Sequence, residues 1–380
     1  MRALILSCNT GEGHNSCAKA IKEVFDEYGE LCDIEDALRF LSIRISKMIS
    51  GFHVGMYRYN PRLFQFGYGY SKRHSGIFEE KSGIYELLTL GSKKLYQFIR
   101  ENEYDIVICT HVFASLIMTN IRKKYGLKIT TYDVTTDYIC NPGTRESCLD
   151  YYFIPDRKIV GDYLCSNISE EKIIVSGIPI RKDFYNKTDK KKAKEKFGIP
   201  IEHKHLLIMC GSMGCGPIVK ITKLLGKEMA EDMELTIICG TNRRLKKRLE
   251  KEFFEMENVR IMGYVQDISS LMDSADLYLT KPGGISVSEA IAKKLPMVFV
   301  NAVAGCEEYN RKYFIKKGCA VTADTEEELV ELCLSLLLND FLIENMINNF
   351  DNTESYNATQ KIYNFIREKH DEVRKTSSRL

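Results

Sequence analysis

Short apolar runs alternate with longer amphipathic segments along most of the chain. We predict strands at residues 2–8, 104–110, 128–133, 151–154, 172–176, 204–210, 234–240, 258–262, 276–280 and 296–300. These runs are too short for helices, and their uninterrupted apolar character is typical of strands that are buried on both faces. Helices are predicted between them, including residues 15–28, 113–125, 217–231, 325–338 and 355–373. This alternation predicts an α/β protein whose parallel sheets are built from right-handed βαβ units.

The composition changes most sharply at Asn186–Lys196, a run rich in lysine. Domain boundaries commonly lie in such polar segments. We therefore predict two doubly wound, Rossmann-like domains, an N-terminal one at residues 1–185 and a C-terminal one at 186–355. Residues 356–380 are predicted to form a C-terminal helix and tail that packs back toward the N-terminal domain.

The composition is that of an ordinary globular protein, and it excludes several classes. The 380 residues carry a net charge of +2, which gives no general case for nucleic-acid binding. The 13 cysteines include no C-x-x-C pair, which argues against a disulfide framework or a zinc site and for a reducing cytoplasm. No apolar run approaches the roughly 18 residues of a membrane-spanning helix. Association with a membrane surface stays open.

The most informative stretch is Asp276–Asn310, which combines a strand, a Gly-Gly turn and a helix. The first backbone N–H groups of a helix have no partner inside it, so the turn at Gly283-Gly284 can bind a phosphate. We expect Ser286 to cap this helix and Glu289 to complete a capping box. The Glu289 carboxylate can also accept hydrogen bonds from a ribose diol. The stretch therefore predicts a nucleotide site.

Two further glycine turns follow predicted strands, Gly11-Glu12-Gly13-His14 and Gly211–Gly216. Ligands of open α/β sheets bind outside the carboxyl ends of the strands, so we expect both turns to face a central cleft between the domains. A Gly-x-Gly turn can also serve only to pack a helix on a sheet. His14 is either structural or an acid or base, and Arg181 is either a surface residue or a diphosphate ligand.

Residues 39–100 differ from the rest of the chain. Eleven Lys and Arg residues against three Glu give this segment a charge of +8, with Tyr and Phe interleaved. Cations and aromatic rings suit an anionic membrane surface, and the candidates are Arg58, Arg62, Phe64, Phe66, Tyr68 and Tyr70. The alternatives are a solvated, partly buried insertion and an RNA-stacking surface. Glycines 51, 55, 67, 69 and 76 are expected to interrupt helices here.

Six motifs resemble those of a known group, the GT-B glycosyltransferases of family 28 that include monogalactosyldiacylglycerol synthases and processive diacylglycerol glucosyltransferases. The N-acetylglucosaminyltransferase of the peptidoglycan lipid pathway is a more distant relative. The motifs are GEGHNSCAKAI (11–21), TTDY (135–138), VSGIPIRKDF (175–184), CGSMGCG (210–216), MGYVQDISSLMDSADL (262–277) and TKPGGISVSEAIAKKLPMV (280–298). The resemblance implies the GT-B fold, with its two parallel sheets on either side of a cleft.

The resemblance also implies a role for each candidate residue. His14 is similar to the family's general base, and Glu289 to the carboxylate that holds the ribose. The implied diphosphate ligands are Arg181, Gly211, Ser212, Met213, Gly214, Gly283, Gly284, Ile285 and Ser286.

Four further residues match family segments on the donor side. Tyr264 and Val265 match the segment around the uracil, and Glu307 and Asn310 match the loop that reads the sugar hydroxyls. Gly13 and Asp137 match the acceptor side.

Two places depart from the family pattern. The lipid synthases carry a His and a Trp shortly after the Thr-Asp motif, where this chain has Asn141 and Thr144. In the donor loop, Cys306 takes the place of a Gln. The first difference concerns the acceptor and the second concerns the sugar.

The resemblance implies an inverting transfer of a hexose from UDP-glucose or UDP-galactose to diacylglycerol or a related membrane lipid, at the inner face of the cell membrane. No metal or other cofactor is expected, because the chain has no D-x-D motif and a helix start with Arg181 can hold a diphosphate. One alternative is a UDP-sugar epimerase or hydrolase that uses Asp137 and Glu307. A sensor of nucleotide sugars and a transferase with a different acceptor are two others.

Overall fold

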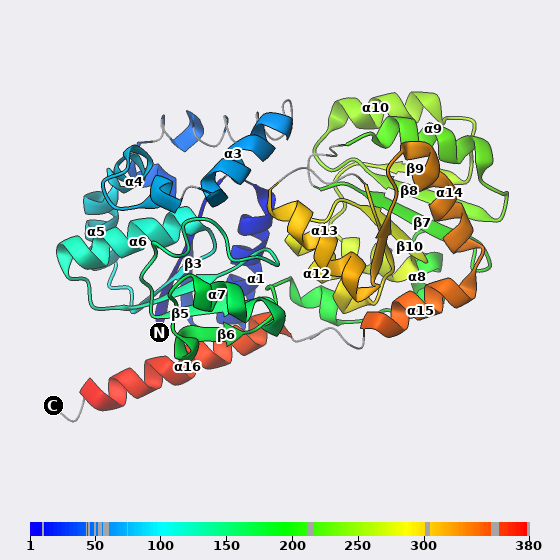
Figure 1. Ribbon diagram of the computed structural model, residues 1–380. Coiled ribbons are helices and arrows are strands. Elements are labelled where there is room, and N and C mark those ends of the chain that lie inside the picture. The colour runs from blue at the N-terminus through cyan, green and yellow to red at the C-terminus, as the bar shows by residue number, and fades with distance from the viewer. Residues whose placement is uncertain are drawn as a thin grey trace. The chain divides into compact units, whose positions relative to one another are not determined.

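The computed structural model describes residues 1–9, 11–42, 44, 46–48, 51, 55, 61–73, 75–211, 214, 216–300, 305–350 and 357–377, without the side chains of residues 61, 62, 64, 65, 73 and 75. Contacts divide the chain into two compact units (Figure 1). Unit 1 comprises residues 1–182, 304–306 and 356–380, and unit 2 comprises residues 183–303 and 307–355. The chain therefore returns to unit 1 at its C-terminal end.

Unit 1 is built on a six-stranded parallel sheet with the order β2-β1-β3-β4-β5-β6. Its strands are β1 (Arg2–Ser7), β2 (Leu31–Asp36), β3 (Ile106–Cys109), β4 (Thr130–Val134), β5 (Tyr151–Ile154) and β6 (Ile173–Val175). Its helices are α1 (Glu12–Glu27), α3 (Pro61–Arg73), α4 (Gly83–Thr89), α5 (Ser92–Glu101), α6 (Val112–Tyr125), α7 (Val160–Cys165) and α16 (Ala358–Ser377). Short 3₁₀ helices lie at Ala37–Phe40, Ser75–Phe78, Arg157–Ile159 and Glu170–Lys172.

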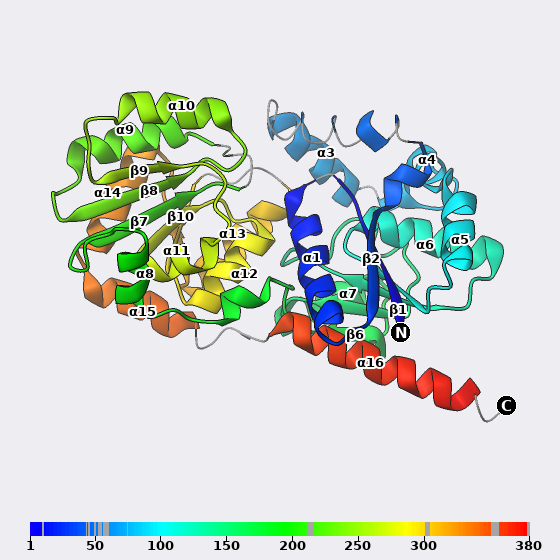
Figure 2. The ribbon, with the colours of Figure 1, turned by 180° about the vertical axis from the view of Figure 1, so that it is seen from behind.

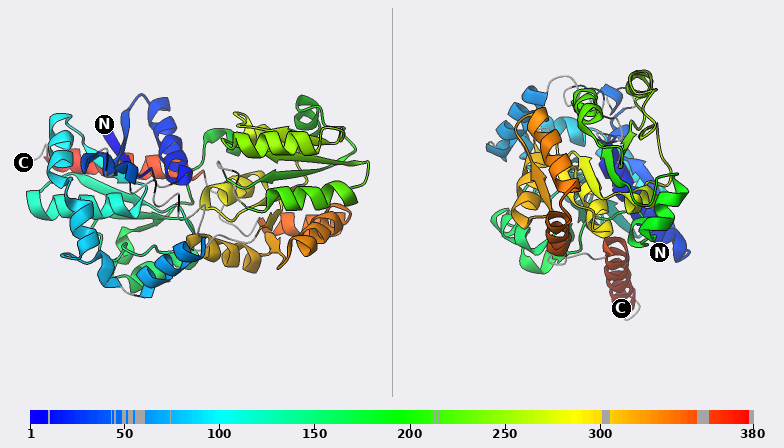
Figure 3. Two further views of the ribbon diagram at one scale, coloured as in Figure 1. Left: turned by 90° about the horizontal axis from the view of Figure 1, so that it is seen from above. Right: turned by 90° about the vertical axis from the view of Figure 1, so that its right-hand side faces the viewer.

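Unit 2 contains a second six-stranded parallel sheet, with the order β12-β11-β10-β7-β8-β9. Its strands are β7 (Lys204–Met209), β8 (Met233–Ile238), β9 (Val259–Met262), β10 (Leu277–Thr280), β11 (Met297–Phe299) and β12 (Ala320–Thr322). Its helices are α8 (Lys190–Lys196), α9 (Ile218–Glu228), α10 (Arg243–Glu252), α11 (Ile268–Ser274), α12 (Gly284–Lys293), α13 (Cys306–Lys317), α14 (Glu326–Leu337) and α15 (Asp340–Phe350). Helices cover both faces of this sheet (Figures 2 and 3). The predicted α/β architecture with two parallel sheets is confirmed.

The strand order of each sheet reverses at one point. In unit 1 the chain starts at β1, moves to β2 on one side and continues from β3 on the other. In unit 2 it starts at β7, moves outward to β8 and β9, and then returns to β10 on the other side of β7. Ligands of open α/β sheets bind outside the carboxyl ends of the strands at such a switch point. The loops after β1 and β3, and after β7 and β10, are therefore where functional residues are expected.

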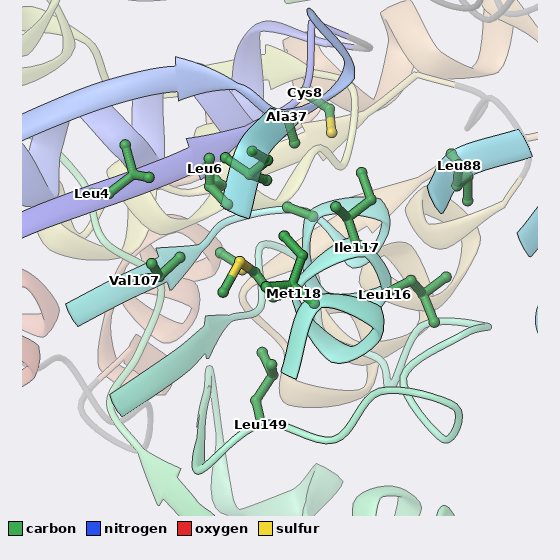
Figure 4. Packing of buried hydrophobic residues seen from close by; sticks show 14 of the residues in the cluster. Leu4, Leu6, Cys8, Ala37, Leu88, Val107, Leu116, Ile117, Met118 and Leu149 are labelled. Atoms are coloured by element: carbon green, nitrogen blue, oxygen red, sulfur yellow. The ribbon is translucent and has the colours of Figure 1, made fainter. Parts of the chain in front are cut away.

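The core of unit 1 forms between β1, β3 and α6. Leu4 and Leu6 of β1, Val107 of β3 and Met118 of α6 are fully buried (Figure 4). Successive residues of a strand point to opposite faces of the sheet, and the alternate residues Ala3 and Ile5 are buried too. Both faces of β1 are therefore covered, which explains its uninterrupted apolar sequence.

The C-terminal helix α16 packs on α1 of the same unit. Tyr363 of α16 stacks on Tyr28 with ring centroids 4.3 Å apart and meets Phe25 edge-on at 5.2 Å. Ile362 and Ile366 of α16 are fully buried. Aromatic pairs and buried aliphatic side chains of this kind hold a terminal helix in place.

The expectation that glycines interrupt helices in residues 39–100 is wrong at Gly67 and Gly69. Both lie inside α3, which is continuous from Pro61 to Arg73. A glycine in a helix interior costs only about 1 kcal/mol relative to alanine. Two such residues weaken a helix of this length without ending it.

Part of the lysine-rich run, Lys190–Lys196, forms α8 of unit 2. Lys194 is only 4% exposed, and its Nζ donates to the carbonyls of Ile201 at 3.0 Å and His203 at 2.6 Å. Lysine stems can be buried when the ammonium finds acceptors. The chain passes from unit 1 to unit 2 between Lys182 and Asp183, three residues before the predicted boundary.

The apolar pattern does not predict the edge strands β2 and β12. The sequence of β2 is LCDIED, half of it acidic, and β12 has only three residues. Edge strands are commonly short or charged because they have a neighbour on one side only. The helix α15 also lacks a sequence prediction.

His205 should make the stability of unit 2 depend on pH. The ring is fully buried, with Nε2 2.8 Å from Thr236 Oγ1 and Nδ1 3.1 Å from Ser274 Oγ. Burial lowers the pKa of His205 from 6.5 to about 4. Below pH 6.5 the unfolded chain takes up a proton that the folded unit does not, so the free energy of unfolding should fall by about 3 kcal/mol between pH 6.5 and 4.

Hydrogen exchange of β7 and β8 peptides in urea, measured at pH 7.5, 5.5 and 4.5, checks this prediction. The variant His205→Gln keeps an amide donor and acceptor but cannot titrate, so its dependence on pH should be flatter. An equal dependence in both proteins would contradict the prediction.

Candidate active site

The first turn of α1 carries His14. Gly11 precedes the helix in an extended conformation, and α1 begins at Glu12 rather than at the predicted Asn15. Gly13 and His14 are thus the second and third residues of the helix. The loop that leads to them follows β1, on one side of the switch point of unit 1.

A backbone carbonyl after β3 orients the His14 ring. His14 Nδ1 lies 2.8 Å from the carbonyl oxygen of Thr110 and 3.1 Å from Thr136 Oγ1. A carbonyl oxygen can only accept a hydrogen bond, so Nδ1 carries the proton and donates a hydrogen bond to the Thr110 carbonyl. In the neutral ring the lone pair is then on Nε2. This is the tautomer that a general base needs. It is fixed by a contact between the segment after β1, which carries His14, and the segment after β3, which carries Thr110.

A second histidine packs against the first. The rings of His14 and His111 meet edge-on with centroids 4.5 Å apart. His111 is the N-cap of α6, and its Nδ1 accepts a hydrogen bond from the backbone N–H of Phe113 at 3.0 Å. His111 is therefore held in place by the helix that it caps, and it packs against the His14 ring.

The turn that supplies Thr136 is anchored on a buried carboxyl group. Asp133, at the end of β4, accepts hydrogen bonds from Ser115 Oγ at 2.6 Å and Thr135 Oγ1 at 3.2 Å. Burial raises the pKa of Asp133 to about 6, and the two hydrogen bonds oppose the shift. The predicted acceptor-side residue Asp137 follows this turn and is also buried.

In unit 2, α12 begins at the second glycine of the Gly-Gly turn. Its N-cap is Gly283, in an extended conformation, and no described side chain caps the helix. Ser286 is the third helical residue, so the predicted cap at Ser286 and its capping box with Glu289 are wrong. The reason is local: a glycine cap lets the helix begin earlier, at Gly284. It also directs the first N–H groups of α12, at Gly284, Ile285 and Ser286, toward the loop after β10.

Glu289 lies one turn further into α12 and is half-buried. Tyr278 of β10 lies near it. Burial raises the pKa of the Tyr278 hydroxyl, and the charge of Glu289 raises it further. A partly buried carboxylate one turn from the helix start is well suited to bind two adjacent hydroxyl groups.

Lys281 is a site residue that sequence reasoning did not single out. Its Nζ forms an ion pair with Glu307 Oε1 at 2.8 Å, and the two side chains are 18% and 7% exposed. Its stem passes over Gly211, where a Cβ atom would lie 2.7 Å from Lys281 Cε. The available signal was its position, since Lys281 directly follows β10 in the TKPGG motif.

Asn310 lies behind the turn. It is fully buried, and its Nδ2 donates to the carbonyl of Pro282 at 2.9 Å. Through this contact Asn310 stabilises the Pro282-Gly283 turn. Contact with sugar hydroxyls, which the resemblance implies for Asn310, stays a prediction.

A cavity of about 590 Å³ opens beside Tyr264, at the carboxyl ends of β8 and β9. Tyr264 is 77% exposed and Val265 is half-buried. The other lining residues are Gly240, Thr241, Arg243, Lys246, Lys247, Glu250 and Gly263. An exposed aromatic ring beside cations suits a planar, negatively charged ligand such as a nucleotide.

Two family descriptions match the chain in succession. Residues 14–180 match monogalactosyldiacylglycerol (MGDG) synthase, and residues 205–362 match the glycosyltransferase family 28 C-terminal domain. The resemblance to glycosyltransferase family 28 that the six motifs predicted is confirmed.

Curated relatives match the chain over nearly its full length. The processive diacylglycerol beta-glucosyltransferase of Bacillus licheniformis is 29% identical over 370 residues, which cover 94% of this chain and 92% of that protein. The protein of the same name from Bacillus subtilis is 28% identical over 374 residues, with coverages of 95% and 93%.

Solved structures show the fold alone. MurG of Acinetobacter baumannii has a TM-score of 0.65 at 14% identity, covering 97% of this chain and 99% of its own. A putative UDP-N-acetylglucosamine 2-epimerase from Listeria monocytogenes also has a TM-score of 0.65 at 14% identity, with coverages of 98% and 97%. The predicted GT-B fold is confirmed, and since it hosts both transferases and epimerases, the reaction must be argued from the site.

The remaining candidate residues fall into three groups. Arg181 is half-buried and belongs to unit 1. Gly211 and Gly214 have positive φ angles of +74° and +55°. Ser212, Met213 and Arg58 lie outside the described residues, as do the side chains of Arg62 and Phe64.

The aromatic residues of α3 divide between surface and interior. Phe66 and Tyr70 are 72% and 47% exposed, with their rings stacked 6.4 Å apart. Tyr68 is half-buried, and its hydroxyl donates to Asn141 Oδ1 at 3.3 Å. Asn141 is one of the two positions that depart from the family pattern after the Thr-Asp motif. No described helix is long and apolar enough to cross a bilayer.

Proposed function

We propose that this chain transfers a hexose from a UDP-sugar to the hydroxyl group of diacylglycerol or a related membrane lipid, with inversion at the anomeric carbon. Glucose is the proposed hexose, because the curated relatives are named as diacylglycerol glucosyltransferases. Galactose is the alternative, which the MGDG synthase match supports.

The observation that carries the proposal is the orientation of His14. Its Nδ1 donates to the Thr110 carbonyl at 2.8 Å, so the neutral ring has its lone pair on Nε2. In the proposed reaction Nε2 takes the proton of the lipid hydroxyl as the oxygen attacks the anomeric carbon from the face opposite UDP. General bases of this kind contribute about 10²- to 10⁴-fold to the rate.

The donor is proposed to bind at the switch point of unit 2. Glu289 accepts hydrogen bonds from the ribose, and Tyr264 packs beside the uracil. The N–H groups at Gly284–Ser286 stabilise the charge on the departing diphosphate. We propose that they act without a bound metal, since helix N–H groups can offset that charge themselves. Arg181 stays the cation that the resemblance implies.

The acceptor is proposed to come from an anionic membrane surface on the cytoplasmic side. Three side chains of α3, Leu63, Phe66 and Tyr70, are exposed at helical spacing. Exposed rings next to cations favour the headgroup region of a bilayer. Peripheral binding of this kind gives the active site access to a substrate that stays in the membrane.

A direct assay tests the function. The purified protein is incubated with UDP-glucose or UDP-galactose and with vesicles that contain diacylglycerol, with or without anionic phospholipid. We expect a monohexosyl lipid by mass spectrometry, with the β configuration by NMR and with more product on anionic vesicles. The variant Glu289→Ala should raise the KM for the UDP-sugar by about tenfold to a hundredfold, because it loses charge-assisted hydrogen bonds.

The other possible products identify the alternatives. Free UDP without glycolipid would indicate a hydrolase, and an altered UDP-sugar would indicate an epimerase. Tight UDP-sugar binding without any product would indicate a sensor. Each of these results would contradict the proposed transfer.

A further inference from the structure

Lys281 lies at the switch point of unit 2. It directly follows β10, whose last residue, Thr280, pairs with Met209 at the end of β7. Thr280 Oγ1 also donates to the Met209 carbonyl at 2.7 Å, which ties the two strand ends together. The ammonium group of Lys281 is therefore carried at the carboxyl ends of the two central strands, where an α/β sheet binds its ligand.

Gly211 makes room for the Lys281 side chain. Its φ of +74° is in the left-handed region, which favours glycine. A Cβ atom at Gly211 would lie only 2.7 Å from Lys281 Cε. The side chain is thus confined between two loops, and with 18% exposure it differs from an ordinary surface lysine.

Glu307 holds the charged end of this side chain. The distance from Lys281 Nζ to Glu307 Oε1 is 2.8 Å, and the carboxylate is 7% exposed. Glu307 is the second residue of α13, and a Cβ atom at Gly283 would lie 3.7 Å from its Oε1. The ion pair consequently lies beside the glycine turn that opens α12.

We propose that Lys281 binds the diphosphate of the donor, and that its ion pair with Glu307 is exchanged when the nucleotide sugar enters. The Lys281 ammonium group then forms an ion pair with the diphosphate. The released Glu307 carboxylate accepts hydrogen bonds from the hexose hydroxyls. Nucleotide binding thereby prepares the site for the sugar. The inference rests on the proposed function, whose donor site it deepens.

The exchange has a physical reason. A lysine ammonium has three donors on a flexible stem, so it can turn from a carboxylate to a phosphate with little movement of the backbone. A diphosphate also carries more charge than one carboxylate and binds the nearby helix N–H groups. A carboxylate left buried without its cation is unfavourable. UDP-glucose supplies hydroxyl donors to the Glu307 carboxylate, and UDP alone does not.

Calorimetric titration with uridine, UDP and UDP-glucose tests the proposal. Lys281→Met should weaken UDP binding by about 10- to 100-fold and leave uridine binding unchanged, because only UDP has the phosphates. Lys281→Arg should retain most of the affinity. Glu307→Gln removes the competing carboxylate, so it should bind UDP at least as tightly as the wild type while losing the preference for UDP-glucose over UDP.

Two further variants serve as controls. Lys281→Met combined with Glu307→Gln leaves no unpaired buried carboxylate, so it tests the lysine without that source of instability. Lys227→Met removes an exposed lysine at the last turn of α9, away from the carboxyl ends of the strands, and should change none of the affinities.

The outcomes separate this inference from the proposed function. Equal losses for uridine and UDP, or unchanged UDP binding in the double variant, would overturn the role of Lys281. Weaker UDP binding in Glu307→Gln would overturn the exchange. A wild-type protein that binds no UDP would refute the proposed function itself, whereas wild-type transfer with unaffected Lys281 variants would refute only the inference.

Discussion

Replacing His14 by Ala is expected to lower the turnover number for glycolipid formation by about 10²- to 10⁴-fold. The variant loses the group that accepts the proton of the attacking hydroxyl. The affinity for UDP should not change, because the residues proposed to bind the donor are others. Initial rates with UDP-glucose and diacylglycerol vesicles, together with calorimetric titration of UDP, measure the two effects separately.

A matched control is His203→Gln, which removes a histidine that lies outside both switch points and pairs with Glu234 at 3.0 Å. Its turnover number should stay close to that of the wild type. Near-normal transfer by a folded His14→Ala protein would remove His14 from the role of base. A parallel loss of UDP affinity would point to a structural defect instead.

Lys293→Met is expected to destabilise unit 2 by about 3–5 kcal/mol, because it leaves the Asp273 carboxylate buried without its cation. Lys293 and Asp273 are 0% and 1% exposed, and their ion pair measures 2.7 Å. The pair also forms hydrogen bonds to the first segment of unit 2. Lys293 Nζ donates to the Asn186 carbonyl at 2.7 Å, and Asp273 Oδ2 accepts from the Thr188 backbone N–H at 3.0 Å.

Urea unfolding measures this loss of stability, and two further variants serve as comparisons. Lys293→Met combined with Asp273→Asn has no buried charge and keeps an acceptor for Thr188, so it should recover much of the stability. Lys294→Met changes the exposed neighbour and should stay within about 0.5 kcal/mol of the wild type. If Lys293→Met were as stable as Lys294→Met, the buried pair would not contribute as argued.

Much of the site follows from short-range sequence patterns. A glycine turn between an apolar strand and a helix predicts the phosphate-binding loop at Gly283-Gly284, and the same reasoning singles out His14 after β1. The motifs around these turns also gave the family, because they keep their order and spacing along the chain. The errors are local: the helix begins at Gly284 rather than at Ser286, and α3 continues through Gly67 and Gly69. In each case the conformational preference of a single residue is too weak to decide where the surrounding helix begins or ends.

The sequence by itself determined most of the strands and helices and where the glycine turns lie, and its motifs gave the resemblance to glycosyltransferase family 28. It could not determine strand order, since a buried apolar strand does not specify its neighbours. Only the fold brings Thr110 to His14, 96 residues away in the chain. It likewise decided that Asn310 is buried behind its turn, and that Lys281 meets Glu307 over Gly211. These contacts depend on which strands are adjacent at a switch point, and adjacency is decided by packing across the whole sheet.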